Sequence, residues 1–268
     1  MFSLDKKVIV VTGATGVLGG AFLNSLKDAN ARLVLIGRNR EVAEKRAKEI
    51  NDGNGEAMTV IADVLDKAQL EKGMQAVLER FGRIDGLVNA AGGNIKEAVL
   101  EPSDDIFSMN IDALKKVFDL NLYGSIIPTQ LFAKEMMKTG GGSIVNISSM
   151  ASQKVITKVL GYSLAKAAVD MYTRWMSVEL AHRFGSALRV NAIAPGFFIT
   201  HQNRSLLTQE DGSLTPRGKA VIHQTPYGRF GEPPELCGAL QWLLSDSSTF
   251  VTGQVISIDG GFSVFSGV

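Results

Sequence analysis

Three side chains that can take part in proton transfer lie close together in the middle of the chain: Ser149, Tyr162 and Lys166. Tyr162 and Lys166 are four residues apart, so on a helix they share one face and lie one turn from each other. A phenol has an ordinary pKa of about 10, and a neighbouring ammonium favours the phenolate and lowers that pKa. A serine hydroxyl from another segment can hydrogen-bond the same substrate oxygen. These groups predict the proton-transfer half of a hydride-transfer reaction, whose other half needs a nicotinamide.

A glycine-rich turn near the N-terminus predicts where that nucleotide binds. The β-branched run 8–11 leads into residues 12–20, which contain Gly13, Gly16, Gly19 and Gly20, and a helical stretch follows to about Ala29. Glycines between a parallel strand and a helix let backbone N–H groups and the helix N-terminus approach a phosphate. Such turns are common in proteins, so this signal gains its weight from the rest of the chain.

The end of the second predicted strand, residues 32–36, bears on the choice of cofactor. In dinucleotide-binding folds an acidic residue about 20 positions beyond the glycines binds the ribose hydroxyls of NAD. This chain has Gly37 there, followed by Arg38 and Asn39. A guanidinium suits a 2′-phosphate, so the sequence favours NADP over NAD. The alternative is that Arg38 only stacks on the adenine or faces solvent.

Predicted strands and helices alternate along the whole chain. Further strands are expected at 57–62, 84–88, 143–147, 188–193 and 255–258, and helices at 41–50, 66–81, 112–138, 162–184 and 233–244. This alternation predicts an α/β fold: a single-domain, doubly wound parallel sheet of about seven strands, Rossmann-like, with helices on both faces and spanning residues 1–268. Residues 197–231 lose the pattern and are expected to form an irregular substrate loop or lid.

The composition excludes several classes of partner. The net charge of +1 gives no basis for binding nucleic acid or an anionic membrane, and the 45% apolar content is that of a globular protein. Cys237 is the one cysteine, so no intrachain disulfide can form and a reducing, cytoplasmic location is expected. The apolar run near the N-terminus is too short to span a membrane and lacks a cleavage pattern. No metal site is predicted.

Several short motifs together resemble the classical short-chain dehydrogenase/reductase family. They occur in order over the whole chain, and as a set they are specific: Thr12-Gly13 with Gly19, Asn89-Ala90-Ala91-Gly92, Asn121, Ser149, Tyr162 with Lys166, and Pro195-Gly196. The resemblance implies that Tyr162 is the general acid/base, that Lys166 lowers its pKa and holds the nicotinamide ribose, and that Ser149 positions the carbonyl. It also implies that Asn121 holds a water on the proton path.

The resemblance also implies the cofactor contacts. They are Gly13, Thr15, Gly16, Val17, Leu18, Gly19, Arg38, Asn39, Asp63, Val64, Asn89, Ala90, Ala91, Gly92, Tyr162, Lys166, Pro195, Gly196, Phe198 and Thr200. One position departs from the pattern, because Val17 stands where the family usually has a second glycine. The backbone there must tolerate a side chain, which puts the pyrophosphate contact in doubt.

A closer likeness is to the short-chain type of D-mannonate oxidoreductase, also called fructuronate reductase. It is carried by residues 91–94, 128–130, 195–200 with 202–203, 225–231 and the tail 259–268. It implies D-fructuronate or D-mannonate as substrate. Enzymes of this type are usually described as NAD-linked, whereas Arg38 favours NADP. Polar candidates for binding a sugar acid are Asn94, Ser149, His201, Gln202, Asn203, His223 and Arg229. The histidines could equally be surface residues, and Arg229 could cap a turn or pair with an acidic neighbour.

Other functions stay open at this point. The substrate could be of the gluconate 5-dehydrogenase or 3-oxoacyl-carrier-protein reductase type. A nucleotide-binding sensor without catalysis is a third hypothesis, although such a protein has no need of Asn121, Ser149, Tyr162 and Lys166 together. The family resemblance also implies a homotetramer, formed through the two long helices 112–138 and 162–184 and the apolar tail from Phe262.

Overall fold

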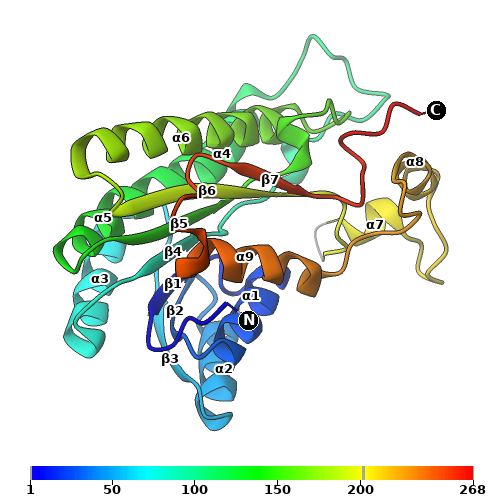
Figure 1. The fold of residues 1–268 in the computed structure, drawn as a ribbon. Helices are drawn as coiled ribbons and strands as arrows, with labels where there is room; N and C mark the ends of the chain where they lie inside the picture. Colours follow the sequence, from blue (N-terminus) through cyan, green and yellow to red (C-terminus); the bar gives the residue numbers. More distant parts are fainter. Residues whose placement is uncertain (1, 201–202, 268) are drawn as a thin grey trace.

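The computed structural model describes residues 2–200 and 203–267, and in these residues seven parallel strands form one sheet in the order β3-β2-β1-β4-β5-β6-β7. Helices cover both sides of the sheet, so the predicted α/β, doubly wound, Rossmann-like fold is confirmed (Figure 1). The strands are β1 (Val8–Thr12), β2 (Arg32–Gly37), β3 (Glu56–Ile61), β4 (Gly86–Asn89), β5 (Gly142–Ile147), β6 (Leu188–Pro195) and β7 (Val255–Ile258).

The sheet register brings polar side chains together at one edge. Thr12 at the end of β1 pairs with Asn89 at the end of β4, and Asn89 pairs with Asn146 on β5. All three are almost completely buried. Parallel strands end at a common edge of the sheet, where ligands bind in folds of this kind.

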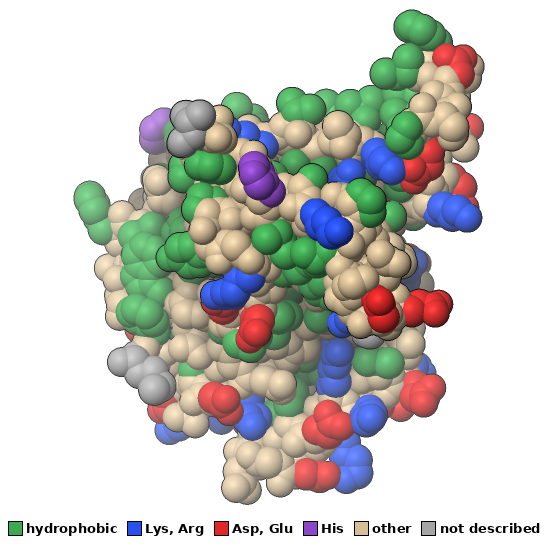
Figure 2. Space-filling model, turned by 90° about the vertical axis from the view of Figure 1, so that its right-hand side faces the viewer, with side chains coloured by type: hydrophobic (Ala, Val, Ile, Leu, Met, Phe, Trp, Pro, Cys, Tyr) green, Lys and Arg blue, Asp and Glu red, His purple; other side chains and the backbone are tan. Residues whose placement is uncertain are grey.

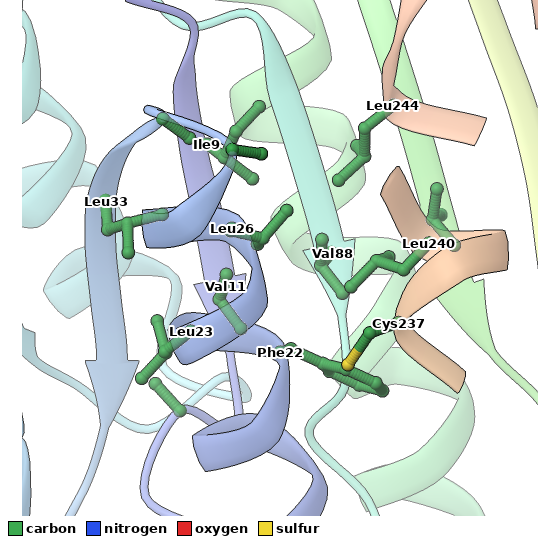
Figure 3. Close-up of a cluster of buried hydrophobic side chains, with 14 of the residues drawn as sticks. Ile9, Val11, Phe22, Leu23, Leu26, Leu33, Val88, Cys237, Leu240 and Leu244 are labelled. Atoms are coloured by element: carbon green, nitrogen blue, oxygen red, sulfur yellow. The ribbon is translucent and has the colours of Figure 1, made fainter. Parts of the chain in front are cut away.

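One face of the sheet is covered by α1 (Val17–Asp28), α2 (Arg40–Asp52) and α9 (Cys237–Leu244). Phe22, Leu23 and Leu26 recur on one side of α1 and pack on the sheet, and Leu240 of α9 lies beside Val88 (Figure 3). Truncating a fully buried side chain such as Phe22 to alanine costs about 3–5 kcal/mol.

The other face is covered by α3 (Lys67–Phe81), α5 (Gly124–Lys138) and α6 (Leu160–Phe184). Leu70 of α3, Phe132 of α5 and Leu180 of α6 belong to one buried apolar cluster with β-branched side chains of the strands. None of the helices within residues 2–200 and 203–267 is long and apolar enough to cross a membrane.

The helix expected over 112–138 is interrupted. It consists of α4 (Ile111–Phe118), a π-helical segment η2 (Asp119–Tyr123) and α5. The side-chain amide of Asn121 donates to the Val117 carbonyl at 2.7 Å, so the side chain uses the acceptor that an α-helical N–H would take. π-helical segments of this kind are frequent at functional sites.

The expectation of an irregular loop over 197–231 was wrong in part, because the segment contains α7 (Arg204–Leu207) and α8 (Pro216–Gln224). Thr215 caps α8 through a hydrogen bond from Gly218 N at 3.0 Å, and Pro216 occupies its first turn. This start signal was present in the sequence but lies in a helix of only nine residues. Both helices lie beyond the carboxyl end of β6 (Figure 1), whereas His201 and Gln202 fall outside the described residues.

Three short 3₁₀ segments lie in the connections near the site. They are η1 (Lys96–Ala98), η3 (Met150–Ser152) and η4 (Pro233–Leu236). A further 3₁₀ turn, η5 (Asp246–Ser248), lies before β7.

Candidate active site

The turn after β1 contacts the segment after β4. The hydroxyl oxygen of Thr12 accepts hydrogen bonds from the backbone N–H groups of Ala90 and Ala91, both at 3.1 Å. Gly13 has a φ of +64°, and a Cβ on it would lie 2.6 Å from the Ala90 carbonyl oxygen. Only glycine therefore fits this close approach of two backbones.

The first helix begins in a way that suits a bound phosphate. No side chain caps α1 after Gly16 and its first turn has no acidic residue, whereas Asn39 caps α2 and Asp66 caps α3. The first N–H groups of α1 are thus left to an outside acceptor, and the helix dipole favours an anion there. A Cβ on Gly19 would lie 2.3 Å from the Gly13 carbonyl oxygen, so this residue must be glycine.

The remaining residues of this turn fit a pyrophosphate. Val17, the departure from the family pattern, starts α1 and is partly buried without strain in its backbone, and Leu18 packs on the core. Thr15 lies against Gly37, where a Cβ would come within 2.8 Å of its methyl carbon. The turn therefore accommodates a side chain at Val17 and keeps its backbone available.

Arg46 of α2 supports this turn through hydrogen bonds, and no local pattern marks it. Its guanidinium donates to the carbonyl oxygen of Ala14 and, at 2.8 Å, to that of Gly16. A Cβ on Gly20 would come within 3.0 Å of the guanidinium carbon, so Gly20 makes room for it. Burial lowers the pKa of Arg46. The turn is thus held in shape by a residue from the second βα unit.

The expected adenosine end carries Arg38 and Asp63. The Arg38 guanidinium nitrogen lies 3.6 Å from an Asp63 carboxylate oxygen, and its side chain is 74% exposed. Asp63 also accepts a hydrogen bond from Leu65 N at 2.9 Å, and Val64 is buried. The Asn39 side-chain oxygen caps α2 by accepting from Val42 N at 3.1 Å. Arg38 is therefore an accessible cation at this corner, held only by an exposed ion pair.

Asn89 is part of a buried polar network. Its amide donates to Thr129 Oγ1 and to Asn146 Oδ1, both at 2.9 Å, and the Asn146 amide donates to Thr173 Oγ1 at 2.9 Å. These bonds between neutral amides and hydroxyls tie the ends of β4 and β5 together, whereas the buried Asn89 Oδ1 has no hydrogen-bond partner among the described residues. The amide nitrogen of Asn89 is thus engaged within the network, and its side-chain oxygen is not.

Gly92 is the point where Asn121 and Lys166 come together. A Cβ on Gly92 would lie 2.6 Å from Asn121 Oδ1 and 3.3 Å from Lys166 Nζ. The Asn121 side chain accepts from Gly93 N at 3.0 Å and donates to Gly93 O at 2.7 Å. Its side-chain amide is therefore occupied by backbone partners, and the expected hold on a water stays a prediction.

Ser149 and Tyr162 lie near each other. Ser149 follows β5 and caps η3, its Oγ accepting from Ala151 N at 3.1 Å. Burial raises the pKa of Tyr162, and the neighbouring Ser149 hydroxyl partly opposes this by lowering it. The two hydroxyls are thus neighbours, and their joint action on a substrate oxygen stays a prediction.

Lys166 lies one turn from Tyr162 on α6 but does not lower its pKa. Lys166 is 4% exposed, and its ammonium donates to the Ile147 carbonyl at 2.7 Å and lies 5.6 Å from the centre of the Tyr162 ring. Burial lowers the pKa of Lys166 to about 8, while Asp170 raises it. The expected lowering of the phenol pKa is absent because the ammonium is directed to a carbonyl and to the ring, and desolvation of the phenolate dominates.

Asp170 is a buried carboxylate that the sequence analysis missed. The Ser148 hydroxyl donates to Asp170 Oδ1, and the Ser152 hydroxyl donates to Asp170 Oδ2 at 2.6 Å. Its signal was its place four residues after Lys166, on the same face of one helix. Ser148 therefore links the end of β5 to α6.

The segment after β6 forms a tight turn. Gly196 N donates to Ile258 O at 2.9 Å beyond Pro195, and Phe198 is buried with its ring against Gly231. Asn203 accepts from Thr200 N at 2.8 Å and donates to Phe198 O at 2.8 Å. The Asn203 amide therefore holds this turn together, and Thr200 is kept next to it.

The remaining substrate candidates differ in whether their polar atoms are already hydrogen-bonded within the protein. Arg229 makes two hydrogen bonds to the Glu235 carboxylate, at 2.8 and 2.6 Å, which lowers the pKa of Glu235 to about 2. Asn94 has a buried side-chain oxygen with no hydrogen-bond partner among the described residues, and His223 is exposed. The alternative that Arg229 pairs with an acidic neighbour is the one the structure supports.

Arg217 is a cation within residues 197–231 that the sequence analysis overlooked. Arg217 of α8 donates weakly to Thr157, at 3.3 Å to its hydroxyl and 3.4 Å to its carbonyl. Within residues 2–200 and 203–267 no carboxylate lies at ion-pair distance from it. Thr157 belongs to the stretch between Ser149 and Tyr162, so Arg217 joins the substrate segment to the site.

Comparison with known proteins identifies the family. Residues 13–263 match a short-chain dehydrogenase model, adh_short_C2, described as enoyl-(acyl carrier protein) reductase. The chain belongs to the short-chain dehydrogenase/reductase family. It is thus an oxidoreductase that uses a nicotinamide nucleotide.

Three relatives illustrate the likeness of this short-chain dehydrogenase/reductase to others. A Bacillus subtilis protein described as an uncharacterized oxidoreductase, UxuB, is 40% identical, covering 99% of this chain and 98% of the relative. A Haemophilus influenza structure, described as a candidate D-mannonate oxidoreductase with bound NAD, is 40% identical. Its TM-score is 0.92, and the match covers 100% of this chain and 98% of the other. A gluconate 5-dehydrogenase from Burkholderia cenocepacia with NADP and tartrate is 31% identical, TM-score 0.87, covering 98% of both chains.

Proposed function

We propose that this short-chain dehydrogenase/reductase interconverts a hexuronate ketone and its alcohol, with D-fructuronate and D-mannonate as the pair. The observation that carries the chemistry is the placement of Tyr162 between the Ser149 hydroxyl and the buried Lys166 ammonium, which lies 5.6 Å from the centre of its ring. The likeness to the Haemophilus structure and the tail and loop motifs support the choice of substrate.

The residues would divide the proton chemistry as follows. When bound, the reduced nicotinamide supplies the hydride that goes to the carbonyl carbon. Tyr162 gives its proton to the carbonyl oxygen as the C–O double bond becomes single, and Ser149 holds that oxygen by a hydrogen bond. A positioned acid of this kind contributes about 10²–10⁴-fold to the rate. In the oxidative direction Tyr162 takes the proton back.

Lys166 would recharge Tyr162 and hold the ribose hydroxyls. Its pKa of about 8 suits exchange of a proton near neutral pH. The backbone of Gly92 and the π-helical segment around Asn121 border its ammonium, so they are placed to orient a water on the path to solvent. Gly13 to Gly19 and the uncapped start of α1 would hold the pyrophosphate.

We propose that NADP is favoured and that NAD is also used. Gly37 offers no carboxylate to a ribose hydroxyl, and the exposed Arg38 stands next to it. An exposed ion pair is worth about 0–1 kcal/mol, so Arg38 can leave Asp63 for a 2′-phosphate at little cost. The relatives with bound NAD and bound NADP are compatible with either choice.

A hexuronate also needs a partner for its carboxylate, and we assign this to Arg217 in place of Arg229. Arg229 is saturated by Glu235, whereas the contacts of Arg217 are long and uncharged. Figure 2 views this end of the molecule and shows Lys, Arg and His side chains among apolar groups in its upper half. Asn94, with its unpartnered oxygen, is the proposed partner for a hydroxyl.

The test of this function is the initial rate on D-fructuronate with NADH and NADPH in parallel. 5-Ketogluconate and an acetoacetyl thioester serve as competing substrates, because relatives act on gluconate and the family model is described for acyl carriers. Turnover of the thioester alone would reject the sugar-acid assignment. A Tyr162→Phe variant with unchanged turnover would instead favour a nucleotide sensor.

We also propose a homotetramer of single-domain chains in a reducing cytoplasm. Large apolar side chains are exposed on α6, at Leu164, Met171, Trp175 and Val178, and at Tyr123 in the π-helical segment before α5. An apolar stripe of this kind is typical of an interface between subunits. Sedimentation equilibrium of the wild type and of Trp175→Glu tests it, since a monomeric wild type would contradict the proposal.

A further inference from the structure

Asp170 is a buried acid that the proposed reaction does not use. It lies on α6, one turn after Lys166, and both side chains belong to residues only 4% exposed. Burying a carboxylate is costly unless hydrogen bonds or an opposite charge compensate it. Such an acid beside a reactive lysine therefore calls for a role.

The hydrogen bonds of Asp170 reach both sides of Ser149. Ser148 donates to one carboxylate oxygen and Ser152 to the other, the latter at 2.6 Å. Ser152 Oγ also lies 2.7 Å from the Ser149 carbonyl oxygen. One carboxylate on α6 thus fastens the turn that presents the Ser149 hydroxyl to Tyr162.

The same carboxylate provides negative charge near Lys166. The other described groups next to its ammonium are uncharged: the Tyr162 ring on α6, the Ile147 carbonyl of β5, the Gly92 backbone and the Asn121 amide of the π-helical segment. Asp170 raises the pKa of Lys166 against the lowering caused by burial. The ammonium and the turn with Ser149 thus depend on one residue.

We propose that Asp170 is a positioning residue of the proton-transfer site: its carboxylate fixes Ser149 through Ser148 and Ser152 and places a negative charge one helical turn from the buried Lys166 ammonium. The proposal rests on the proposed function only for its catalytic consequences. The arrangement of charge and hydrogen bonds belongs to the fold itself.

The test separates charge from hydrogen bonding. Asp170→Asn removes the charge and keeps an oxygen acceptor, whereas the double variant Ser148→Ala/Ser152→Ala removes the hydrogen bonds and keeps the charge. The full-length protein, labelled with ¹³C at the lysine ε carbon, is titrated by NMR, and the Lys166 resonance is assigned with Lys166→Met. Charges one helical turn apart interact by roughly 2 kcal/mol or more at an effective dielectric of 20, so a shift of at least about one pH unit is expected.

Asp170→Asn should lower the titration midpoint of Lys166 by at least about one pH unit. The alkaline limb of the pH profile of kcat should move to lower pH by the same amount. The double serine variant should lower kcat about tenfold or more with the midpoint unchanged. If Asp170→Asn does not fold by circular dichroism, Asp170→Ser replaces it, since serine also bonds without charge.

The proposal is overturned if the Lys166 midpoint is the same in the wild type and the uncharged variant. It is also overturned if the double serine variant shifts the midpoint as far as the loss of charge does. Because the NMR titration needs no turnover, absence of activity on every sugar acid would reject the substrate and leave this test intact.

Discussion

Replacing Gly92 by alanine is expected to damage catalysis more than folding. The new Cβ would stand 2.6 Å from Asn121 Oδ1, closer than real Cβ contacts come, and 3.3 Å from Lys166 Nζ. Asn121 must move, and its two hydrogen bonds with Gly93, each worth about 1 kcal/mol, weaken. A displacement approaching 1 Å at the ribose and proton path can cost about 10²-fold in rate. We expect kcat to fall 10- to 100-fold and stability by about 2 kcal/mol.

The matched control is Gly238→Ala on α9, where a Cβ meets nothing within 4 Å. Alanine is the better helix former by about 0.8–1 kcal/mol, so this variant should be slightly more stable and equally active. Steady-state rates on the best substrate and urea denaturation of both variants check the prediction. A Gly92→Ala enzyme with kcat within twofold of the wild type would refute the adjacency of Gly92, Asn121 and Lys166 in the working site.

Three further predictions concern single arginines. Arg217→Gln should raise KM for the hexuronate about 10-fold or more, because it removes a carboxylate partner worth at least about 1.4 kcal/mol. Arg229→Gln is the control, and an equal rise in KM in both variants would contradict the assignment. Arg38→Ala should lower kcat/KM for NADPH about 10-fold and leave NADH within twofold, as measured by parallel initial rates, and equal losses would argue against a 2′-phosphate contact. The depressed pKa of Glu235 stabilises the fold above about pH 4.5, and this contribution is lost as pH falls toward about 2. Thermal melts of Arg229→Gln over that range should therefore lose less stability on acidification than those of the wild type.

Local patterns were enough to predict the architecture. Uninterrupted β-branched runs such as 8–11 predicted the strands because a strand buried on both faces has no polar side to alternate with. Tyr162 and Lys166 could be paired from spacing because helical geometry fixes which side chains share a face, whereas Ser149 was assigned by the family resemblance. The interruption at Asn121 escaped because it depends on a side chain competing for a backbone acceptor.

Long-range contacts explain what the sequence did not reveal. Arg46 and Arg217 act on segments far away in the chain, and nothing in their own neighbourhoods marks them. The engagement of Arg229 by Glu235 depends on how one turn meets the next helix. The direction of the Lys166 ammonium, toward the Ile147 carbonyl, depends on how α6 packs against the end of β5.

The brace formed by Arg46 links the assembly of two parts of the chain. The turn between β1 and α1 takes its shape from carbonyl contacts made by a residue on α2, so a fragment ending before Arg46 lacks the means to set that shape. If this turn holds the pyrophosphate as proposed, we expect nucleotide affinity to depend on the docking of α2, which carries Arg46.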